Sequence, residues 1–472
     1  MKSLAKNYFL NLTYQVLTVI LPLVTAPYLA RVLGADKIGE YSFAQSIVSY
    51  FTLFSIMGTT LYGQRAIASC HARGESKKQV FWELVAIRGI NVALALGIYF
   101  AAVFRFSDNH LLYAVAAIEI LAVAFDISWF YQGIEQFQNI TLCNGLSKLL
   151  GAAGIFLFVK TRDDLAVYVL FLCGAMLVGN LAQWVFVWPY LKGENLCNLR
   201  ISQHLRPSIR LFVSQFAIQA YTVLDKTMIG LITKSDYENG YYDQAQHLIR
   251  ALVTLVTSIG TVMASRITIL LHSGSKEWKE QVEDLILFSF RLVFALSLPI
   301  AVGVIIIMPR FVPIYYGPNY EPVIQLIQLL AAIVPIIGCS NIVGMQLFVP
   351  SGREDLLTKS VAIGAMVNIV LNSVFISSWG ALGAALASVI AEMTVTGVQI
   401  FYARKDIHIG RIFKLLARYL VLSAIIGCVG IWVSAHVGMG IMGIFAIILS
   451  CVLVYVALLL GLKDPVLRLF KM

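Results

Sequence analysis

The heptapeptide GEYSFAQ (39–45) recurs 201 residues later as GYYDQAQ (240–246). Both copies hold a glycine, a tyrosine, an alanine and a glutamine at the same spacing, and the same offset pairs Arg65 with Arg266. Identities at one fixed offset are the sequence signature of an internal repeat. The chain is therefore predicted to contain two copies of one structural unit.

The composition indicates which solvent surrounds these two copies. Hydrophobic residues make up 59% of the 472 residues, charged residues make up 13%, and the mean hydropathy is +0.82. This apolar content exceeds what a soluble core needs, so the chain is predicted to be a membrane protein. Apolar runs of about 20 residues cross a hydrocarbon core of about 30 Å and predict helices rather than the shorter strands of a barrel. We expect fourteen spans, at residues 8–31, 41–64, 82–104, 111–131, 139–159, 165–190, 209–233, 242–270, 285–308, 322–348, 357–378, 381–402, 414–435 and 440–461.

The repeat and the spans together predict the domain organisation. The matched segments lie six spans apart, and an even number of crossings gives both copies the same orientation, as in transporters whose two lobes surround a central path. The last two spans fall outside the repeat. We therefore expect an all-α polytopic membrane protein with one six-helix lobe at 1–200, a second at 201–405 and an additional helix pair at 406–472.

The distribution of basic residues predicts the orientation of the chain. With the N-terminus inside, the inner loops and tails hold 23 Lys or Arg and the outer loops hold 7, which follows the positive-inside rule. The net charge of +10 is therefore interpreted as a topology signal, and no nucleic-acid partner is expected. The basic inner segments 71–78 and 403–414 are predicted to lie beside anionic lipid. Both termini are expected in the cytoplasm.

Glutamines inside the expected helices predict a polar path. Gln215 and Gln219 lie one helical turn apart in the seventh span. Gln45 in the second span matches Gln246 in the eighth through the repeat. Two interpretations stay open: these side chains line a hydrated cavity, or they form hydrogen bonds between the helices of a packed bundle.

Cations inside the expected helices point more directly to a cavity. Lys226 lies in the seventh span and Arg250 in the eighth. A cation well inside a bilayer costs about 2.5–3.5 kcal/mol on insertion scales, so it usually faces a wet cavity, a partner or a substrate. Arg88 lies near the inner end of the third span and is expected to snorkel to the interface.

Acidic residues inside the spans balance these cations. Glu119 and Asp126 lie seven residues apart and are expected on one face of a single helix. Asp225 adjoins Lys226, and Glu392 lies near the middle of the twelfth span. Two interpretations stay open for these acids: structural ion pairs, or a relay for protons or sodium ions.

Three separated segments resemble a known family. They are LPLVTAPYLARVLGADKIGEYSFAQSI (21–47), FDISWFYQGIEQF (125–137) and WGALGAALASVIAE (379–392). They resemble the Wzx-type polysaccharide flippases of the multidrug/oligosaccharidyl-lipid/polysaccharide exporter superfamily, and the resemblance covers nearly the whole chain. It implies two six-helix lobes, with two further helices in some branches. In the second segment, Trp129 and Tyr131 are expected at the membrane interface.

The resemblance implies a transport function. The substrate would be an undecaprenyl-pyrophosphate-linked oligosaccharide, moved from the inner to the outer leaflet of the bacterial cytoplasmic membrane for the synthesis of O-antigen lipopolysaccharide, capsule or exopolysaccharide. Arg31, Lys226 and Arg250 are our candidates for holding the anionic head. Coupling to H⁺ or Na⁺ stays open. Membrane lipids, a polysaccharide polymerase and export proteins are the further expected partners, and no cofactor is expected.

Two alternatives were compared with this function. An ion-coupled multidrug antiporter of the same superfamily would favour an acid-lined cavity, whereas Lys226 and Arg250 are cations. A membrane glycosyltransferase or polymerase would need acidic catalytic residues on a sizeable outer loop, and the longest one, 309–321, holds a single acid. The sequence shows no Walker or GxSxG motif, and its seven cysteines form neither a CxxC pair nor a metal-like cluster with histidine. We therefore expect a transporter rather than an enzyme, with no metal.

Overall fold

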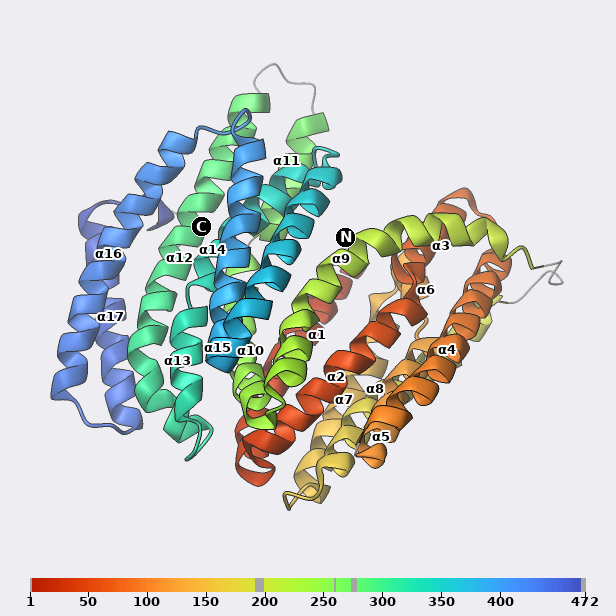
Figure 1. Cartoon of the computed structure of the whole chain (residues 1–472). Helices are drawn as coiled ribbons and strands as arrows, with labels where there is room; N and C mark the ends of the chain where they lie inside the picture. Colours follow the sequence, from red (N-terminus) through yellow and green to blue (C-terminus); the bar gives the residue numbers. More distant parts are fainter. Residues whose placement is uncertain (1, 108, 192–198, 259, 273–277, 468–472) are drawn as a thin grey trace. The chain divides into compact units, whose positions relative to one another are not determined.

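The computed structural model describes residues 2–107, 109–191, 199–258, 260–272 and 278–467 (Figure 1). Helices fill these ranges, and no strand occurs within them. Nine of the helices in this described part of the chain are long and apolar enough to cross a membrane. The all-helical membrane fold predicted from the sequence is confirmed.

The chain divides into two compact units. Unit 1 comprises Met1–Gly230 and Ser235–Gly240, and unit 2 comprises Leu231–Lys234 and Tyr241–Met472. The predicted lobe boundaries at 200 and 405 stay a prediction. The helices up to the end of unit 1 are α1 (Lys2–Val32), α2 (Gly34–Ile56), α3 (Thr59–Arg73), α4 (Lys78–Phe106), α5 (His110–Phe125), α6 (Ser128–Gly133), α7 (Phe137–Phe158), α8 (Leu165–Val187), η1 (Trp188–Leu191) and α9 (Ser202–Thr233). Those that follow are α10 (Asp236–Thr257), α11 (Gly260–His272), α12 (Trp278–Tyr315), α13 (Glu321–Leu330), α14 (Ile333–Asn341), η2 (Ile342–Phe348), α15 (Glu354–Ala403), α16 (Ile409–His436) and α17 (Ile441–Gly461).

The fourteen expected spans coincide with single helices or with consecutive shorter ones. The exception to a simple match is α15, which contains two expected spans, 357–378 and 381–402. Gly380 separates them with φ 55° and ψ −132°, a backbone conformation that is open mainly to glycine. The two spans are therefore distinct helices joined at Gly380.

The helices of the repeat break at matching positions. In the first copy, α2 ends at Ile56 and α3 begins at Thr59. In the second copy, α10 ends at Thr257 and α11 begins at Gly260, which are the same positions 201 residues later. The matched sequences therefore form the same local structure, a long helix followed by a break and a shorter helix.

Two matched glycines lie in close mutual contact within unit 1. A Cβ atom on Gly39 would overlap the carbonyl oxygen of Asp236, and a Cβ atom on Gly240 would overlap the carbonyl oxygen of Ala35. Ala35 and Asp236 are themselves related by the offset of 201 residues, so the contact is reciprocal. Backbones approach this closely only where side chains are minimal, as in small-residue contacts between membrane helices.

Arg88 of α4 fills a break in the helix that carries the FDISWF sequence. The side chain is 2% exposed. Its Nη1 lies 3.2 Å from Asp126 Oδ2 and also donates to the Asp126 carbonyl, which the break frees from its helical partner. Its other nitrogens donate to the hydroxyls of Thr59 and Thr60 over 2.8–3.1 Å. The expectation that Arg88 snorkels was wrong, because neighbouring helices cover it completely.

Asp126 also starts the next helix. Its Oδ1 accepts the Ser128 amide at 3.0 Å, which satisfies one donor that the first turn of α6 leaves open. The Trp129 indole donates to the Asp126 carbonyl at 3.2 Å. Trp129 and Tyr131 are buried, and the Tyr131 hydroxyl donates to the Gln183 carbonyl at 2.6 Å. The prediction that both rings lie at the membrane interface was therefore wrong, since they pack against α3, α4 and α8.

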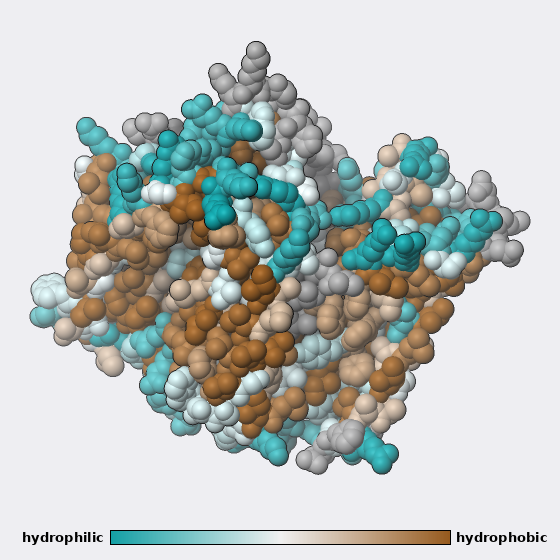
Figure 2. All heavy atoms as spheres, turned by 45° about the horizontal axis from the view of Figure 1, so that its top comes forward, coloured by the Kyte–Doolittle hydropathy of each residue, from teal (hydrophilic) through white to brown (hydrophobic). Residues whose placement is uncertain are grey.

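The surface agrees with a lipid environment. Large apolar side chains such as Leu94 and Ile98 of α4 and Leu453 of α17 are each 61% exposed. Figure 2 shows hydrophobic residues over much of the visible face, with hydrophilic residues gathered mainly in its upper part and along its lower edge. Such exposed apolar surface is favourable in contact with acyl chains and unfavourable in water.

Candidate functional site

Two of the candidate site residues meet in unit 1. The Gln45 amide of α2 donates to Glu119 Oε2 of α5 at 2.7 Å, and the Tyr41 hydroxyl donates to Gln45 Oε1 at 3.1 Å. Tyr41 in turn packs edge-on against Tyr168 of α8, with ring centroids 5.3 Å apart. The Gln45 side chain is thus held at both ends, and Glu119 receives a neutral donor. Within the described chain, no cation pairs with Glu119.

The neighbouring face of α2 contacts α9. Thr227 Oγ1 lies 3.0 Å from Ser46 Oγ and 3.2 Å from the Tyr50 hydroxyl. This contact fixes the turn of α9 that carries Asp225 and Lys226. The Asp225 side chain is buried and that of Lys226 is partly buried. The buried Asn239 side chain donates to the Lys226 carbonyl at 3.0 Å, so the backbone here is also anchored.

Unit 2 holds a directed chain of hydrogen bonds. The Gln246 amide donates to the Tyr242 hydroxyl at 3.2 Å, which lies 3.0 Å from Ser388 Oγ. The Ser388 hydroxyl donates onward to the Ala384 carbonyl at 2.9 Å, so Tyr242 must donate to Ser388. The pairing of Tyr242 with Gln246 has the same residues and spacing as that of Tyr41 with Gln45. The duplicated heptapeptide therefore builds a tyrosine–glutamine hydrogen bond twice.

The remaining charged candidates of unit 2 extend this polar strip. Arg250 lies one turn beyond Gln246 on α10, and Glu392 lies one turn beyond Ser388 on α15. Arg250 is exposed and Glu392 is partly buried. On each helix, a neutral member of the Tyr242–Ser388 hydrogen bond is thus followed by a charged residue, which is Arg250 on α10 and Glu392 on α15.

The other candidates are placed as follows. Arg31 is exposed in the last turn of α1. Gln215 and Gln219 belong to α9, but their side chains lie outside the described residues. Asp126 does not share a helix face with Glu119, because α5 ends at Phe125 and Asp126 pairs with Arg88. This geometry favours the structural ion pair for Asp126 and leaves Glu119 as the acid with a neutral partner.

Two site features were missed from the sequence. The tyrosines 41 and 242 were recognised as repeat identities, but their role in orienting the glutamines was not. Their spacing of four residues before each glutamine on a helix could have indicated this contact. Ser388 gave no comparable signal, because its role depends on the packing of α10 against a distant segment of the chain.

Comparisons with known proteins assign the chain to a family. A family model described as "Polysaccharide biosynthesis protein" matches residues 4–264, and one described as "Lipid II flippase MurJ" matches residues 150–451. The chain belongs to the polysaccharide biosynthesis protein family. The residues matched by the first model include α2, α5 and α9, which carry the contacts of Gln45 and Thr227. The residues matched by the second include α10 and α15, which carry the hydrogen bonds of Tyr242.

Individual relatives of this family agree with that assignment. A "Putative O-antigen transporter" of Escherichia coli (strain K12) is 24% identical over 413 residues, which cover 86% of this chain and 97% of the relative. Among solved structures, the lipid II flippase MurJ in an inward closed conformation aligns with a TM-score of 0.70 at 15% identity, covering 96% of this chain and all of that one.

A multidrug transporter of the MATE family gives a weaker match. Its inward-facing structure aligns with a TM-score of 0.56 at 13% identity, over 84% of this chain and 98% of that one. At this identity the likeness concerns the fold alone. The multidrug alternative therefore rests on a shared architecture, while membership of the polysaccharide family rests on sequence.

Proposed function

We propose that the chain is a flippase that moves a polyprenyl-pyrophosphate-linked oligosaccharide from the inner to the outer leaflet of the bacterial cytoplasmic membrane, with both termini in the cytoplasm. The observation that carries the proposal is the match of a polysaccharide biosynthesis model to residues 4–264. The lipid-linked substrate class is supported by the O-antigen transporter relative and the match to the lipid II flippase model.

The hydrogen-bonded polar side chains around Gln45 in unit 1 and Gln246 in unit 2 suit such a substrate. Sugars carry many hydroxyl groups, which exchange hydrogen bonds with amides and hydroxyls such as those of Gln45 and Gln246. The pyrophosphate is anionic, and Lys226 in unit 1 and Arg250 in unit 2 are each proposed to contact it during transport. A guanidinium binds phosphate through paired donors, whereas an ammonium acts as a point charge.

Glu119 is our candidate for ion coupling. It accepts a hydrogen bond from the Gln45 amide, which leaves its charge uncompensated by a cation among the described residues. A carboxylate in this position can take up a proton or a sodium ion without breaking a structural ion pair. Asp225 and Glu392 stay candidates for ion coupling as well, whereas Asp126 pairs with Arg88 at the break between α5 and α6.

The test uses a strain from which the resident flippase has been deleted. Surface polysaccharide is measured for each variant and divided by the amount of that variant in the membrane. Lys226→Glu and Arg250→Glu are expected to abolish complementation. A charge-assisted contact contributes about 1.5–3 kcal/mol, so the neutral variants Lys226→Gln and Arg250→Gln should weaken substrate capture about ten- to hundred-fold. Arg250→Lys should be intermediate.

A matched control separates transport from folding. Arg105→Glu reverses an exposed cation at the end of α4 and should leave the polysaccharide unchanged. If Lys226 has a structural role through Asp225, Lys226→Gln should lower protein abundance, and the added change Asp225→Asn should restore it. Wild-type polysaccharide from both Glu variants at normal abundance would refute the role of these cations.

A further inference from the structure

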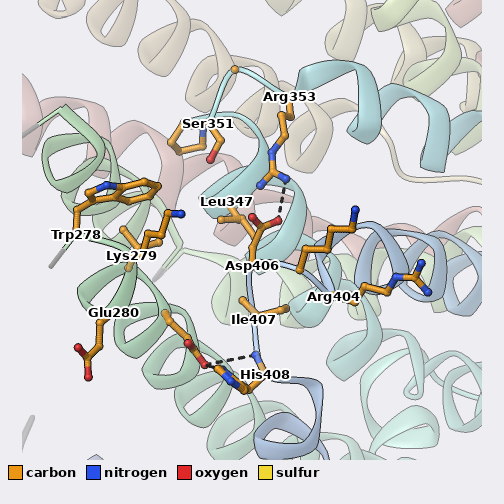
Figure 3. Close-up of a pocket in the computed structure, with 15 residues that line it drawn as sticks. Trp278, Lys279, Glu280, Leu347, Ser351, Arg353, Arg404, Asp406, Ile407 and His408 are labelled. Atoms are coloured by element: carbon orange, nitrogen blue, oxygen red, sulfur yellow. Dashed lines mark hydrogen bonds and ion pairs between the residues drawn. The ribbon is translucent and has the colours of Figure 1, made fainter. Parts of the chain in front are cut away.

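Unit 2 contains a pocket of about 930 Å³ where three of its helices begin (Figure 3). Residues of the first turn of α12, of the segment that leads into α15 and of the segment that leads into α16 line it. Neither Arg353, the cap residue of α15, nor His408, the cap residue of α16, makes a side-chain capping hydrogen bond. The first amides of these helices therefore add a positive electrostatic potential to the pocket.

Basic side chains dominate the lining once internal pairs are considered. Arg353 binds Asp406 at 2.8 Å, so this carboxylate is neutralised. Glu283 is held by His408 and lies 3.7 Å from Arg411 Nη1. Each of these acids is thus compensated within the lining or beside it.

Lys279 and Lys405 are further cations of the lining, and the Lys279 ammonium lies 5.6 Å from the centroid of the Trp278 ring. Within the described part of the chain, neither pairs with a carboxylate. Figure 3 shows the Lys279 side chain directed toward the pair of Arg353 and Asp406, whereas the Glu280 carboxylate points away from it. The Lys279 ammonium is therefore directed into the pocket, and Lys405 adds a second positive charge to the lining.

Arg353 is a third cation of the lining. Its Nε atom is buried and has no hydrogen-bond partner among the described residues. The guanidinium lies 5.2 Å from the ring centroid of Phe348, which fixes its plane while one edge binds Asp406. The guanidinium therefore contributes positive charge to the lining of the pocket through its remaining edge.

Exposed aromatic side chains lie on the helices on either side of the 404–408 segment that lines the pocket. Arg404 stacks on Phe401 with 4.2 Å between the guanidinium carbon and the ring centroid, and Phe401 itself is 54% exposed. Phe413, one turn into α16, is 63% exposed. A molecule with an anionic head and an apolar chain would place its head among the cations and its chain along Phe401, which Arg404 of the lining contacts.

We infer that this pocket binds a phosphate group, carried either by an anionic glycerophospholipid or by a soluble phosphate compound. The orientation predicted from the charge distribution would put this end of unit 2 on the cytoplasmic side, where anionic lipid headgroups and soluble phosphates both occur. The site differs from the polar strips of the proposed transport path, because none of its lining residues belongs to them.

The experiment measures binding to the purified full-length protein in a neutral detergent. Thermal unfolding is followed while water-soluble dihexanoyl phosphatidylglycerol is added, since a ligand that binds the folded state raises the Tm in a concentration-dependent way. Wild-type protein should show a saturable rise. The double variant Lys279→Gln/Lys405→Gln should require about ten-fold or more ligand for the same rise.

A second double variant controls for net charge. Lys359→Gln/Lys414→Gln removes two exposed cations outside the pocket and should behave as the wild type does. Inorganic phosphate distinguishes the sources: a rise with both probes would support a site for the phosphate group itself, and a rise with the lipid alone would support a lipid headgroup site. Equal lipid binding by both double variants would overturn the inference. The inference would also be overturned if dihexanoyl phosphatidylcholine raised the Tm as much as dihexanoyl phosphatidylglycerol does, and if Lys279→Gln/Lys405→Gln did not change that rise.

Discussion

Arg88 Nη1 lies 3.2 Å from Asp126 Oδ2 at the point where α5 ends, and the same arginine bonds the backbone carbonyl of Asp126. One side chain therefore neutralises an acid and satisfies a carbonyl that the helix break leaves without its partner. Asp126 in turn caps α6 through the Ser128 amide. This network explains why a polar sequence, FDISWF, lies within an apolar span.

Arg88→Met should destabilise unit 1 strongly. It removes the charge partner of the Asp126 carboxylate, whose side chain is 22% exposed, and one of the two donors to the Asp126 carbonyl. A broken buried pair costs about 3–5 kcal/mol, which is an upper bound for this partly exposed acid. Thermal unfolding of the purified variant should show a lower Tm, and the double variant Arg88→Met/Asp126→Asn should recover part of the loss. Arg65→Gln, an exposed cation of α3, is the control. A normal Tm for Arg88→Met with lost complementation would instead assign Arg88 to transport.

Gly240→Ala should disrupt the contact between the starts of α2 and α10. The added methyl group overlaps the carbonyl oxygen of Ala35, which is backbone and cannot rotate away. Overpacking of this kind typically costs about 1–3 kcal/mol. Gly97→Ala in α4 is the matched control, because a Cβ atom there meets no other atom within 4 Å. If both variants unfold at the same temperature, the close contact of Gly39 and Gly240 does not exist in the folded protein.

Glu119→Gln should separate charge from shape. The variant keeps the size of the side chain and a carbonyl oxygen that can accept from Gln45, so its abundance should stay normal. If Glu119 carries the coupled ion, polysaccharide export should fall and its dependence on external pH or Na⁺ should disappear. Wild-type export with an unchanged ion dependence would remove Glu119 from the coupling mechanism and leave Asp225 and Glu392.

The topology follows from the distribution of charges. A reporter fused after Lys471 should behave as cytoplasmic, and one inserted in the 309–321 segment should behave as external. Reporters of both kinds, such as a phosphatase and a fluorescent protein, give opposite signals and check each other. The reverse pattern would invert the orientation and would place the phosphate pocket of unit 2 on the outer side.

The helices were predictable from the sequence, and most of their interruptions were not. Apolar runs located the helices because lipid requires long segments whose backbone hydrogen bonds are closed internally. The break after Phe125 depends on Arg88, which lies far away in the sequence, and no local pattern announces it. Arg88 and Trp129 were placed at the interface because they lie near helix ends, but their burial depends on which neighbouring helices cover them.

The candidate site was predictable only in part, because sequence patterns show local structure and not tertiary contacts. The repeat located Gln45 and Gln246, since identical residues at one offset reveal a shared structure. Their partners, Glu119 on α5 and Ser388 behind Tyr242, come from tertiary packing. The basic segment 403–414 was interpreted as a topology anchor, and its contribution to a pocket appears only once the starts of α12, α15 and α16 are assembled around it.

The most direct test of the central claim is a flipping measurement with purified protein. Liposomes containing the protein and a polyprenyl-pyrophosphate-linked oligosaccharide are treated with an external enzyme that degrades the exposed glycan. With wild-type protein the inner-leaflet pool should become accessible much faster than in protein-free liposomes, and Lys226→Glu should slow this exchange toward the protein-free rate while Arg105→Glu should not. An exchange rate with the wild-type protein equal to that of empty liposomes, at normal folding and with the required ion gradient imposed, would contradict the assignment as a flippase.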